Sequence, residues 1–110
     1  MKARLPRPLE ILNSEPWDED IQFNVDGVPY SWPDDASAEL GLRPIKTPNA
    51  SATLQLNLGN GLVWVNPSRL GIRGSEAQME TVGPGVYDLE IKIQNKTRIQ
   101  GQVIVSDGIL

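Results

Sequence analysis

The chain has 110 residues, and its 14 Asp and Glu against 10 Lys and Arg give a net charge of −4. It contains neither cysteine nor histidine, so a disulfide framework, thiolate metal sites and Ser-His-Asp chemistry are excluded. We therefore expect no metal or cofactor. The net negative charge does not favour binding to nucleic acid, which requires a basic surface. No apolar run approaches the roughly 20 residues of a membrane span.

The first segment, residues 1–8, is expected to be an extended arm, because its two prolines fix φ and disfavour helix. It has no apolar core of the kind that a signal peptide requires, so we expect the chain to be made and used without secretion. Lys2, Arg4 and Arg7 make it a small basic head. Two interpretations stay open: a disordered terminus, or an arm that docks onto the acidic face of an adjacent subunit.

A short strand is expected at 9–12, and an acidic loop at 13–20 that carries Trp17, Asp18 and Glu19. All acidic residues of the first half lie between positions 10 and 39, without an intervening cation. A solvated face is the favoured interpretation. A hard-cation site is the alternative, although the spacing is not that of a calcium-binding loop. This face is also a candidate partner for a neighbour's basic arm.

The middle of the chain reads as strands separated by Gly- and Pro-bearing turns. The alternation of apolar and polar residues predicts strands at 21–25, 36–42 and 69–72, a hairpin at 52–65, and an irregular loop at 28–35. Trp17, Tyr30 and Trp32 lie in loops that contain proline. Such aromatics either anchor a protein partner, stack on a sugar, or fold back over the ends of a small core.

The last third carries the clearest pattern. Ser75 and Gln78 form a possible capping box, which predicts at most two turns of helix near 75–82. Residues 87–93 and 97–105 then alternate with period 2 and predict a long β-hairpin. A capped turn followed by Gly-x-Tyr resembles the tyrosine corner of immunoglobulin-like sandwiches, with Tyr87 in the structural position.

Asp88 and Glu90 are the carboxylates that this hairpin places on one strand face. They are candidates for the acid and base of a glycoside hydrolase. The same spacing describes any outward polar face, which is the favoured interpretation. We therefore expect no enzymatic activity.

These patterns predict an all-β protein: an immunoglobulin-like β-sandwich of about seven or eight strands, at most one short helix near 75–82, and an extended N-terminal arm. Residues 1–20 are assigned to the arm and acidic loop, and residues 21–110 to the sandwich domain.

A family resemblance rests on the order of several motifs, which together cover residues 21–110. They are Phe23-Asn24-Val25-Asp26-Gly27-Val28-Pro29, a small-residue strand at 36–43 that ends in Arg, Gly85-Val86-Tyr87-Asp88-Leu89, Gly101-Gln102-Val103-Ile104-Val105 and Gly108-Ile109. This series resembles small tailed-bacteriophage proteins that are similar to the immunoglobulin-like domains of baseplate upper proteins and tail-fibre bases. Residues 1–20 depart from the pattern.

The resemblance implies a structural virion protein at the tail, baseplate or fibre attachment point, assembled in the host cytoplasm in symmetric copies and bound to other virion proteins. It brings no catalytic residues. The residues expected to contact partners are Arg4, Arg7, Trp17, Asp18, Glu19, Tyr30 and Trp32. The alternatives are a capsid decoration protein and a carbohydrate-binding sandwich that aids host attachment through Trp17, Tyr30 and Trp32.

Overall fold

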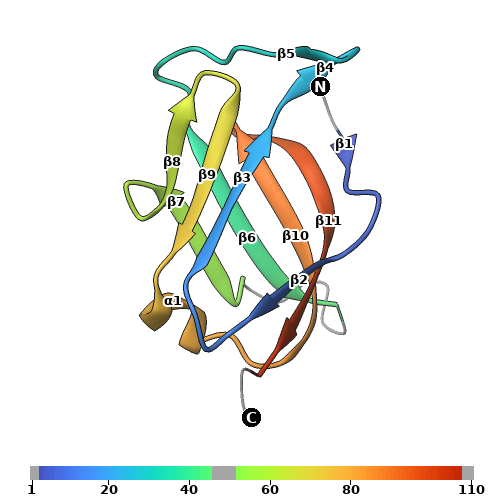
Figure 1. Cartoon of the computed structure of the whole chain (residues 1–110), viewed down its shortest axis with the longest axis vertical. Coiled ribbons are helices and arrows are strands. Elements are labelled where there is room, and N and C mark those ends of the chain that lie inside the picture. The colour runs from blue at the N-terminus through green and yellow to red at the C-terminus, as the bar shows by residue number, and fades with distance from the viewer. Residues whose placement is uncertain (1–2, 46–51, 108–110) are drawn as a thin grey trace.

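The computed structural model describes residues 3–45 and 52–107, and within these ranges it consists of strands and one short helix (Figure 1). This confirms the all-β class. Nine strands form one mixed sheet in the order β1-β11-β10-β6-β7-β8-β9-β3, with β2 also paired to β11, while β4 and β5 form a separate hairpin. The elements are β1 Ala3–Arg4, β2 Leu9–Leu12, β3 Trp17–Gln22, β4 Asn24–Val25, β5 Val28–Pro29, β6 Ala38–Pro44, β7 Leu54–Leu58, β8 Gly61–Asn66, β9 Arg69–Gly74, α1 Glu76–Glu80, β10 Gly85–Ile93 and β11 Lys96–Ser106.

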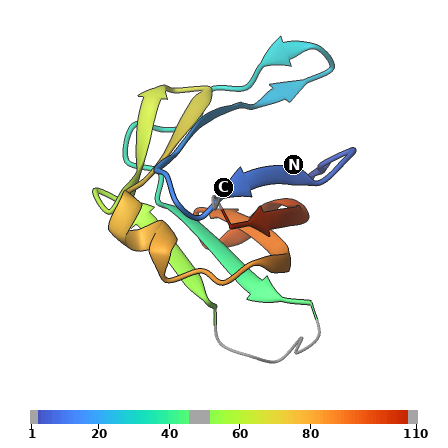
Figure 2. The same ribbon diagram turned by 60° about the horizontal axis from the view of Figure 1, so that its bottom comes forward.

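The sheet curls, so that β8, β9 and β3 lie over β6, β10 and β11 (Figures 1 and 2). The chain passes from one layer to the other between β7 and β8, which meet only at residues 57–58 and 61–62, in parallel register. The expected antiparallel hairpin at 52–65 is therefore wrong. Gly59 and Gly61 have φ of 81° and 100°, and a Cβ on Gly61 would lie 2.5 Å from Leu56 Cδ2. These glycines allow the chain to pass from one layer of the sheet to the other instead of forming a hairpin turn.

The acidic segment forms a strand rather than the expected loop. The chain turns at residues 13–16 and enters β3 at Trp17, which pairs with β9. Trp17 and Ile21 face the core while Asp18 and Asp20 face solvent, so the acidic residues are the outward half of a period-2 pattern. The expected boundary at residue 20 falls inside this strand, and residues 3–20 contribute strands to the same sheet as the rest of the chain.

The predicted C-terminal hairpin is confirmed and forms the centre of the sheet. Its turn residues, Gln94 and Asn95, both have positive φ, as a tight two-residue hairpin turn requires. Nine residues of β10 pair with β11, and seven of them also pair with β6 on the other side. The inward side chains of β10 are buried: Tyr87, Leu89, Ile91 and Ile93.

The predicted helix is confirmed as α1. The Ser75 hydroxyl accepts from the Gln78 amide (3.1 Å), and the Gln78 side chain accepts from the Ser75 amide (2.8 Å), which completes the capping box. Met79 and Val82 are fully buried, so the helix closes one end of the core. Lys2 and the Gly108-Ile109 motif lie outside the described residues.

Candidate functional site

The N-terminal arm lies on its own domain from residue 3 onwards. β1 runs parallel to β11, and the Leu5 amide donates to the Gln100 carbonyl (2.8 Å). Leu5 occupies the space over Gly101, where a Cβ would lie 2.7 Å from Leu5 Cδ1. The described residues of this arm are therefore ordered on their own domain, which overturns the interpretation as a disordered terminus, while docking of the arm onto a neighbour stays a prediction. Arg4 and Arg7 are nevertheless exposed and remain available to partners.

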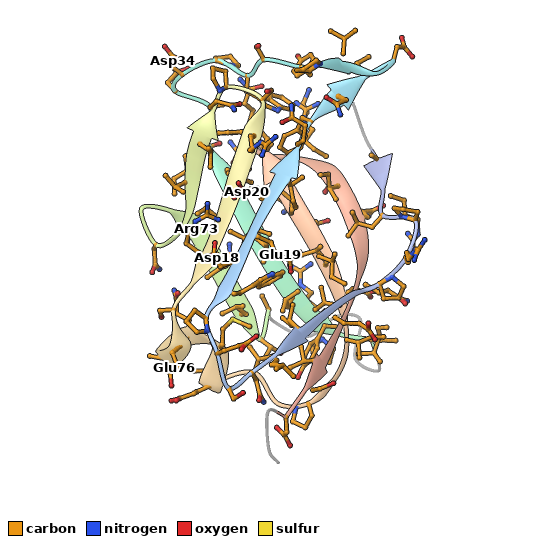
Figure 3. All side chains as sticks on the ribbon, in the orientation of Figure 1. Asp18, Glu19, Asp20, Asp34, Arg73 and Glu76 are labelled. Carbon is orange, nitrogen blue, oxygen red and sulfur yellow. The ribbon has the colours of Figure 1, made fainter. Side chains whose placement is uncertain are left out.

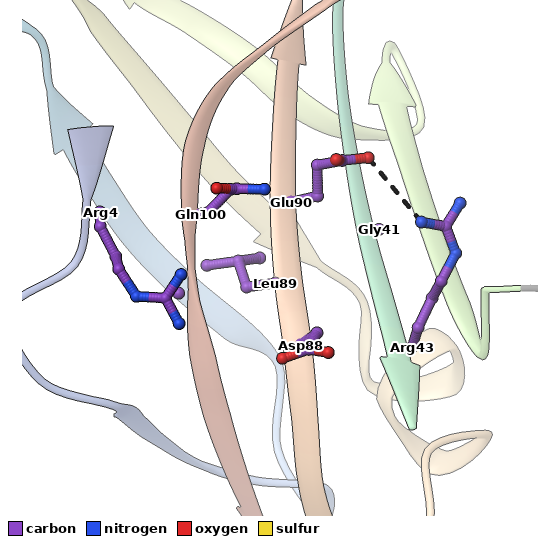
Figure 4. A pocket seen from close by; sticks show the side chains of 8 residues that line it. Arg4, Gly41, Arg43, Asp88, Leu89, Glu90 and Gln100 are labelled. Carbon is purple, nitrogen blue, oxygen red and sulfur yellow. Dashed lines mark ion pairs between the residues drawn. The ribbon is translucent and has the colours of Figure 1, made fainter. Parts of the chain in front are cut away.

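A shallow polar groove of about 350 Å³ lies on the outer face of β11, β10 and β6 (Figure 4). Glu90 lies at its centre, 3.8 Å from the Arg43 guanidinium and 3.7 Å from the Lys92 ammonium, and accepts a hydrogen bond from the Thr97 hydroxyl (2.8 Å). Asp88 shares this outward face and is exposed. The charge of Glu90 is thus balanced by its neighbours in the sheet, which fits the interpretation as a wet face.

The acidic side chains of β3 are paired with cations of β9. Arg73 reaches Asp20 (2.7 Å) and Asp18 (3.1 Å) across the two strands (Figure 3). Gly71 makes this possible, because a Cβ there would lie 2.9 Å from the Arg73 Cζ. Asp18 was expected in a loop facing a partner. It lies on a strand and joins a cross-strand network with Arg73, while its side chain is 75% exposed and its contact with a partner stays a prediction.

Trp17 and Trp32 lie in the core, with exposed fractions of 3% and 4%. The Trp17 indole donates to Glu19 (2.8 Å), so Glu19 also turns inward. The Trp32 amide donates to the Pro67 carbonyl, and its ring lies under the Arg98 guanidinium (5.0 Å). The expectation that these tryptophans are exposed anchors is wrong, because a small core recruits them to cover its ends. Tyr30, which packs against Trp32, is 40% exposed.

Tyr87 forms the hydrogen bond expected of it. Its ring is 8% exposed, and its hydroxyl donates to the Gly83 carbonyl oxygen, four residues upstream (2.7 Å). This bond ties the start of β10 to the segment that leaves α1. The role of Tyr87 is therefore structural.

The β4–β5 hairpin projects from one end of the sheet (Figure 2), and it carries Val28, the most exposed of the large apolar side chains in the described residues. Val25, Val28 and Tyr30 are 43%, 63% and 40% exposed, and we call them the hairpin patch. The Tyr30 amide donates to the Phe23 carbonyl (2.8 Å), which closes the hairpin at its base. Sequence reasoning missed it, although Asp-Gly between two valines is a strong hairpin signal.

The turn of this hairpin is held in the conformation that its sequence favours. Asp26 and Gly27 have φ of 52° and 80°, as a turn with two left-handed residues requires. Pro29 lacks the backbone N–H that a residue in the middle of a sheet donates to its neighbour. It is tolerated because β5 pairs only with β4 and has a free edge.

Further observations concern ligands and membranes. Within residues 3–45 and 52–107, no group of three or more Asp, Glu, His or Cys side chains is arranged to hold a metal ion. No helix of those ranges has the length and apolar character needed to cross a bilayer. Compared with models of known protein families and with curated proteins, the sequence matches none.

Proposed function

We propose that the chain is a structural virion protein of a tailed bacteriophage, which assembles through protein–protein contacts at the tail, baseplate or fibre attachment point. In this proposal the curled sheet is an immunoglobulin-like β-sandwich, repeated in symmetric copies and bound to other virion proteins. Assembly takes place in the host cytoplasm. The phage origin rests on the sequence motifs, and the mode of action rests on the exposed hairpin.

The hairpin patch is the observation that carries the proposal. The Asp26-Gly27 turn and the Tyr30–Phe23 hydrogen bond hold Val25 and Val28 at the end of the molecule, beside the exposed part of Tyr30, whose ring packs on Trp32. Apolar surface gains free energy when a partner covers it, at about 25 cal/mol per Å². A preordered hairpin also loses little conformational entropy on binding. This combination suits a contact between proteins.

The alternatives differ in how they fit the same residues. Carbohydrate binding required Trp17 and Trp32 as stacking platforms, and both are buried. They also lie far apart, because Trp17 pairs with Gly74 next to α1, whereas Trp32 bonds Pro67 at the opposite end of β9. Capsid decoration uses the same kind of contact at another place in the particle. It is therefore distinguished by location rather than by chemistry.

The test removes the coding sequence from the phage genome that carries it and examines the particles by electron microscopy. We expect defective tails or unattached fibres, restored by the wild-type chain and not by Val28→Asp. Val63→Asp is the matched control, since Val63 is an exposed valine of β8 (45%) away from the hairpin. Immunogold labelling of wild-type particles separates a tail from a capsid location. Purified particles that lack the chain would refute the proposal.

A further inference from the structure

A cleft lies between β2 and β3, which separate from each other after the turn at residues 13–16 (Figure 1). It holds about 440 Å³, and we call it the edge cleft, because β3 forms one edge of the curled sheet and β2 lies at the other. In the part of the chain that the structure describes, β3 pairs with β9 alone and β2 with β11 alone, so no strand fills the space between them. The lining combines apolar with acidic side chains: Ile11, Leu12, Pro16 and Trp17 with Glu10, Glu15, Asp18 and Glu19.

Most of the carboxylates in the edge cleft have no cation beside them. Asp18 is the exception, because Arg73 of β9 lies 3.1 Å from it. Glu19 accepts a hydrogen bond from an indole of its own strand, which carries no charge. Within the described ranges, no ion pair involves Glu10, Glu15 or Glu19. The cleft therefore suits a cationic side chain that is flanked by apolar groups.

The chain carries a segment of this kind. Pro6, Arg7 and Pro8 join β1 to β2, and all three are exposed. The two rings fix φ and keep Arg7 out of the helical region, which limits the conformational freedom that binding would remove. No ion pair or hydrogen bond of the Arg7 side chain occurs among the described residues. Arg4 differs, because it lines the polar groove together with Asp88.

The edge cleft of one copy is out of reach of the same copy's Arg7. The β2 strand lies between them and is held in register against β11 from Leu9 to Leu12. An extended chain from Pro8 to Leu12 spans about 13 Å, which is longer than an arginine side chain. Arg7 therefore cannot reach Glu15 on the far side of its own cleft. A contact between the two surfaces must join different copies.

We propose that the segment Pro6-Arg7-Pro8 of one copy binds in the edge cleft of another copy. The proposal deepens the assembly role proposed above and rests on it. The guanidinium pairs with the carboxylates of Glu10 and Glu15, and the proline rings cover Leu12 and Pro16. Every copy carries both surfaces, so two copies exchange these segments about a twofold axis, or several copies close a ring. The contact is small, and a small interface associates weakly in solution.

The first experiment follows self-association of the full chain by sedimentation between ~10 µM and ~1 mM, the range in which weak complexes form. We expect concentration-dependent oligomers that weaken between ~0.05 M and ~0.5 M salt, because salt screens exposed charges. Arg7→Glu and Glu15→Lys should each weaken association by at least ~10-fold, because each places like charges in contact. Lys96→Glu and Asp34→Lys make the same changes in net charge at exposed positions elsewhere and should associate like wild type. Circular dichroism verifies that each variant is folded.

Mixing the two variants tests whether the two surfaces contact each other. Arg7→Glu retains an intact cleft and Glu15→Lys retains the arginine, so an equimolar mixture should form dimers although neither variant associates alone. A contact through the hairpin patch predicts instead that Val28→Asp is monomeric and Arg7→Glu associates normally, which would overturn the inference. A wild-type chain that stays monomeric to ~1 mM would also overturn it.

Cysteine pairing gives a readout that tolerates weak association, because the chain has no cysteine of its own. A chain with Pro6→Cys, mixed with a longer, tagged chain with Leu12→Cys, should give the mixed disulfide dimer on a non-reducing gel. Both variants keep the charged residues of the contact. Pro6→Cys mixed with Val63→Cys is the control and should give far less of it. If the mixed dimer is absent while the chain is present in virions, this inference fails and the proposed function stands. A chain that forms the mixed dimer but is absent from virions shows the reverse.

Discussion

The N-terminal strands and the C-terminal hairpin differ in strand length, in strand direction and in their place within the sheet. β10 and β11 are 9 and 11 residues long, antiparallel, and bury alternate apolar side chains. β1, β2 and β3 have 2, 4 and 6 residues, and β1 and β2 run parallel to β11. The difference follows from position, because the hairpin lies inside the sheet, whereas the N-terminal strands form both of its edges.

An edge strand must discourage pairing with other chains, and the N-terminal residues are suited to this. The Pro6-Arg7-Pro8 segment interrupts one edge between β1 and β2, and outward carboxylates of β3 mark the other. Proline, charge and short strands are the means by which natural sheets protect their edges. The acidic residues and prolines that suggested an arm and a loop therefore belong to the sheet as edge protection.

The largest expected effect tests whether the N-terminal edge is part of the core. Trp17→Ala should lower the free energy of unfolding by about 3–5 kcal/mol, because it removes a buried aromatic ring and leaves a cavity. Urea denaturation followed by circular dichroism measures this. Val63→Ala, at an exposed position of β8, is the control and should change stability by less than about 1 kcal/mol. An effect of Trp17→Ala as small as that of the control would mean that β3 is not packed on the core.

The C-terminal hairpin could be predicted from the sequence, whereas β1 and β3 could not. The alternation in 87–105 has no competing signal, so the hairpin and the preceding capping box were predicted correctly. In β3 the apolar partners are only Trp17 and Ile21 among acidic residues, and charge density concealed the period. Gly59 and Gly61 both adopt positive φ at the crossing, and the sequence Gly-Asn-Gly by itself does not distinguish this from a hairpin turn.

The candidate site was less accessible to sequence reasoning than the fold. Whether an aromatic residue near a loop is buried depends on which distant segments pack beside it. The sequence therefore could not show that Trp17 and Trp32 are buried whereas Tyr30 is exposed. Val25 continued the alternation of a predicted strand and Val28 fell in a predicted irregular loop, so the sequence did not indicate that both are exposed on one hairpin. Residues 44–45 and 84–87, which line a groove of about 580 Å³, meet only through the pairing of β6 with β10, and this pairing is not visible in the local sequence.

The next prediction concerns the contact between the two regions. Gly101→Ala should destabilise the protein by about 1–3 kcal/mol, because the new Cβ would lie within 3 Å of three Leu5 side-chain atoms. Adding Leu5→Ala removes two of these three atoms, Cγ and Cδ1, and leaves only the Cβ in close contact. The double variant should therefore lose less stability than the sum of the single variants, by about 0.5 kcal/mol or more. Thermal and urea unfolding of the four proteins complete this cycle. Additive effects would show that the arm does not pack over Gly101 in solution.

The smallest effect is expected inside the C-terminal region. Tyr87→Phe keeps the buried ring and removes only the hydroxyl that donates to the Gly83 carbonyl, so it should cost about 0.5–1.5 kcal/mol. Tyr30→Phe is the matched control, because no hydrogen bond of the Tyr30 hydroxyl occurs within the described ranges, and it should leave stability unchanged. Equal stability of both variants and wild type would show that the ring alone secures this corner.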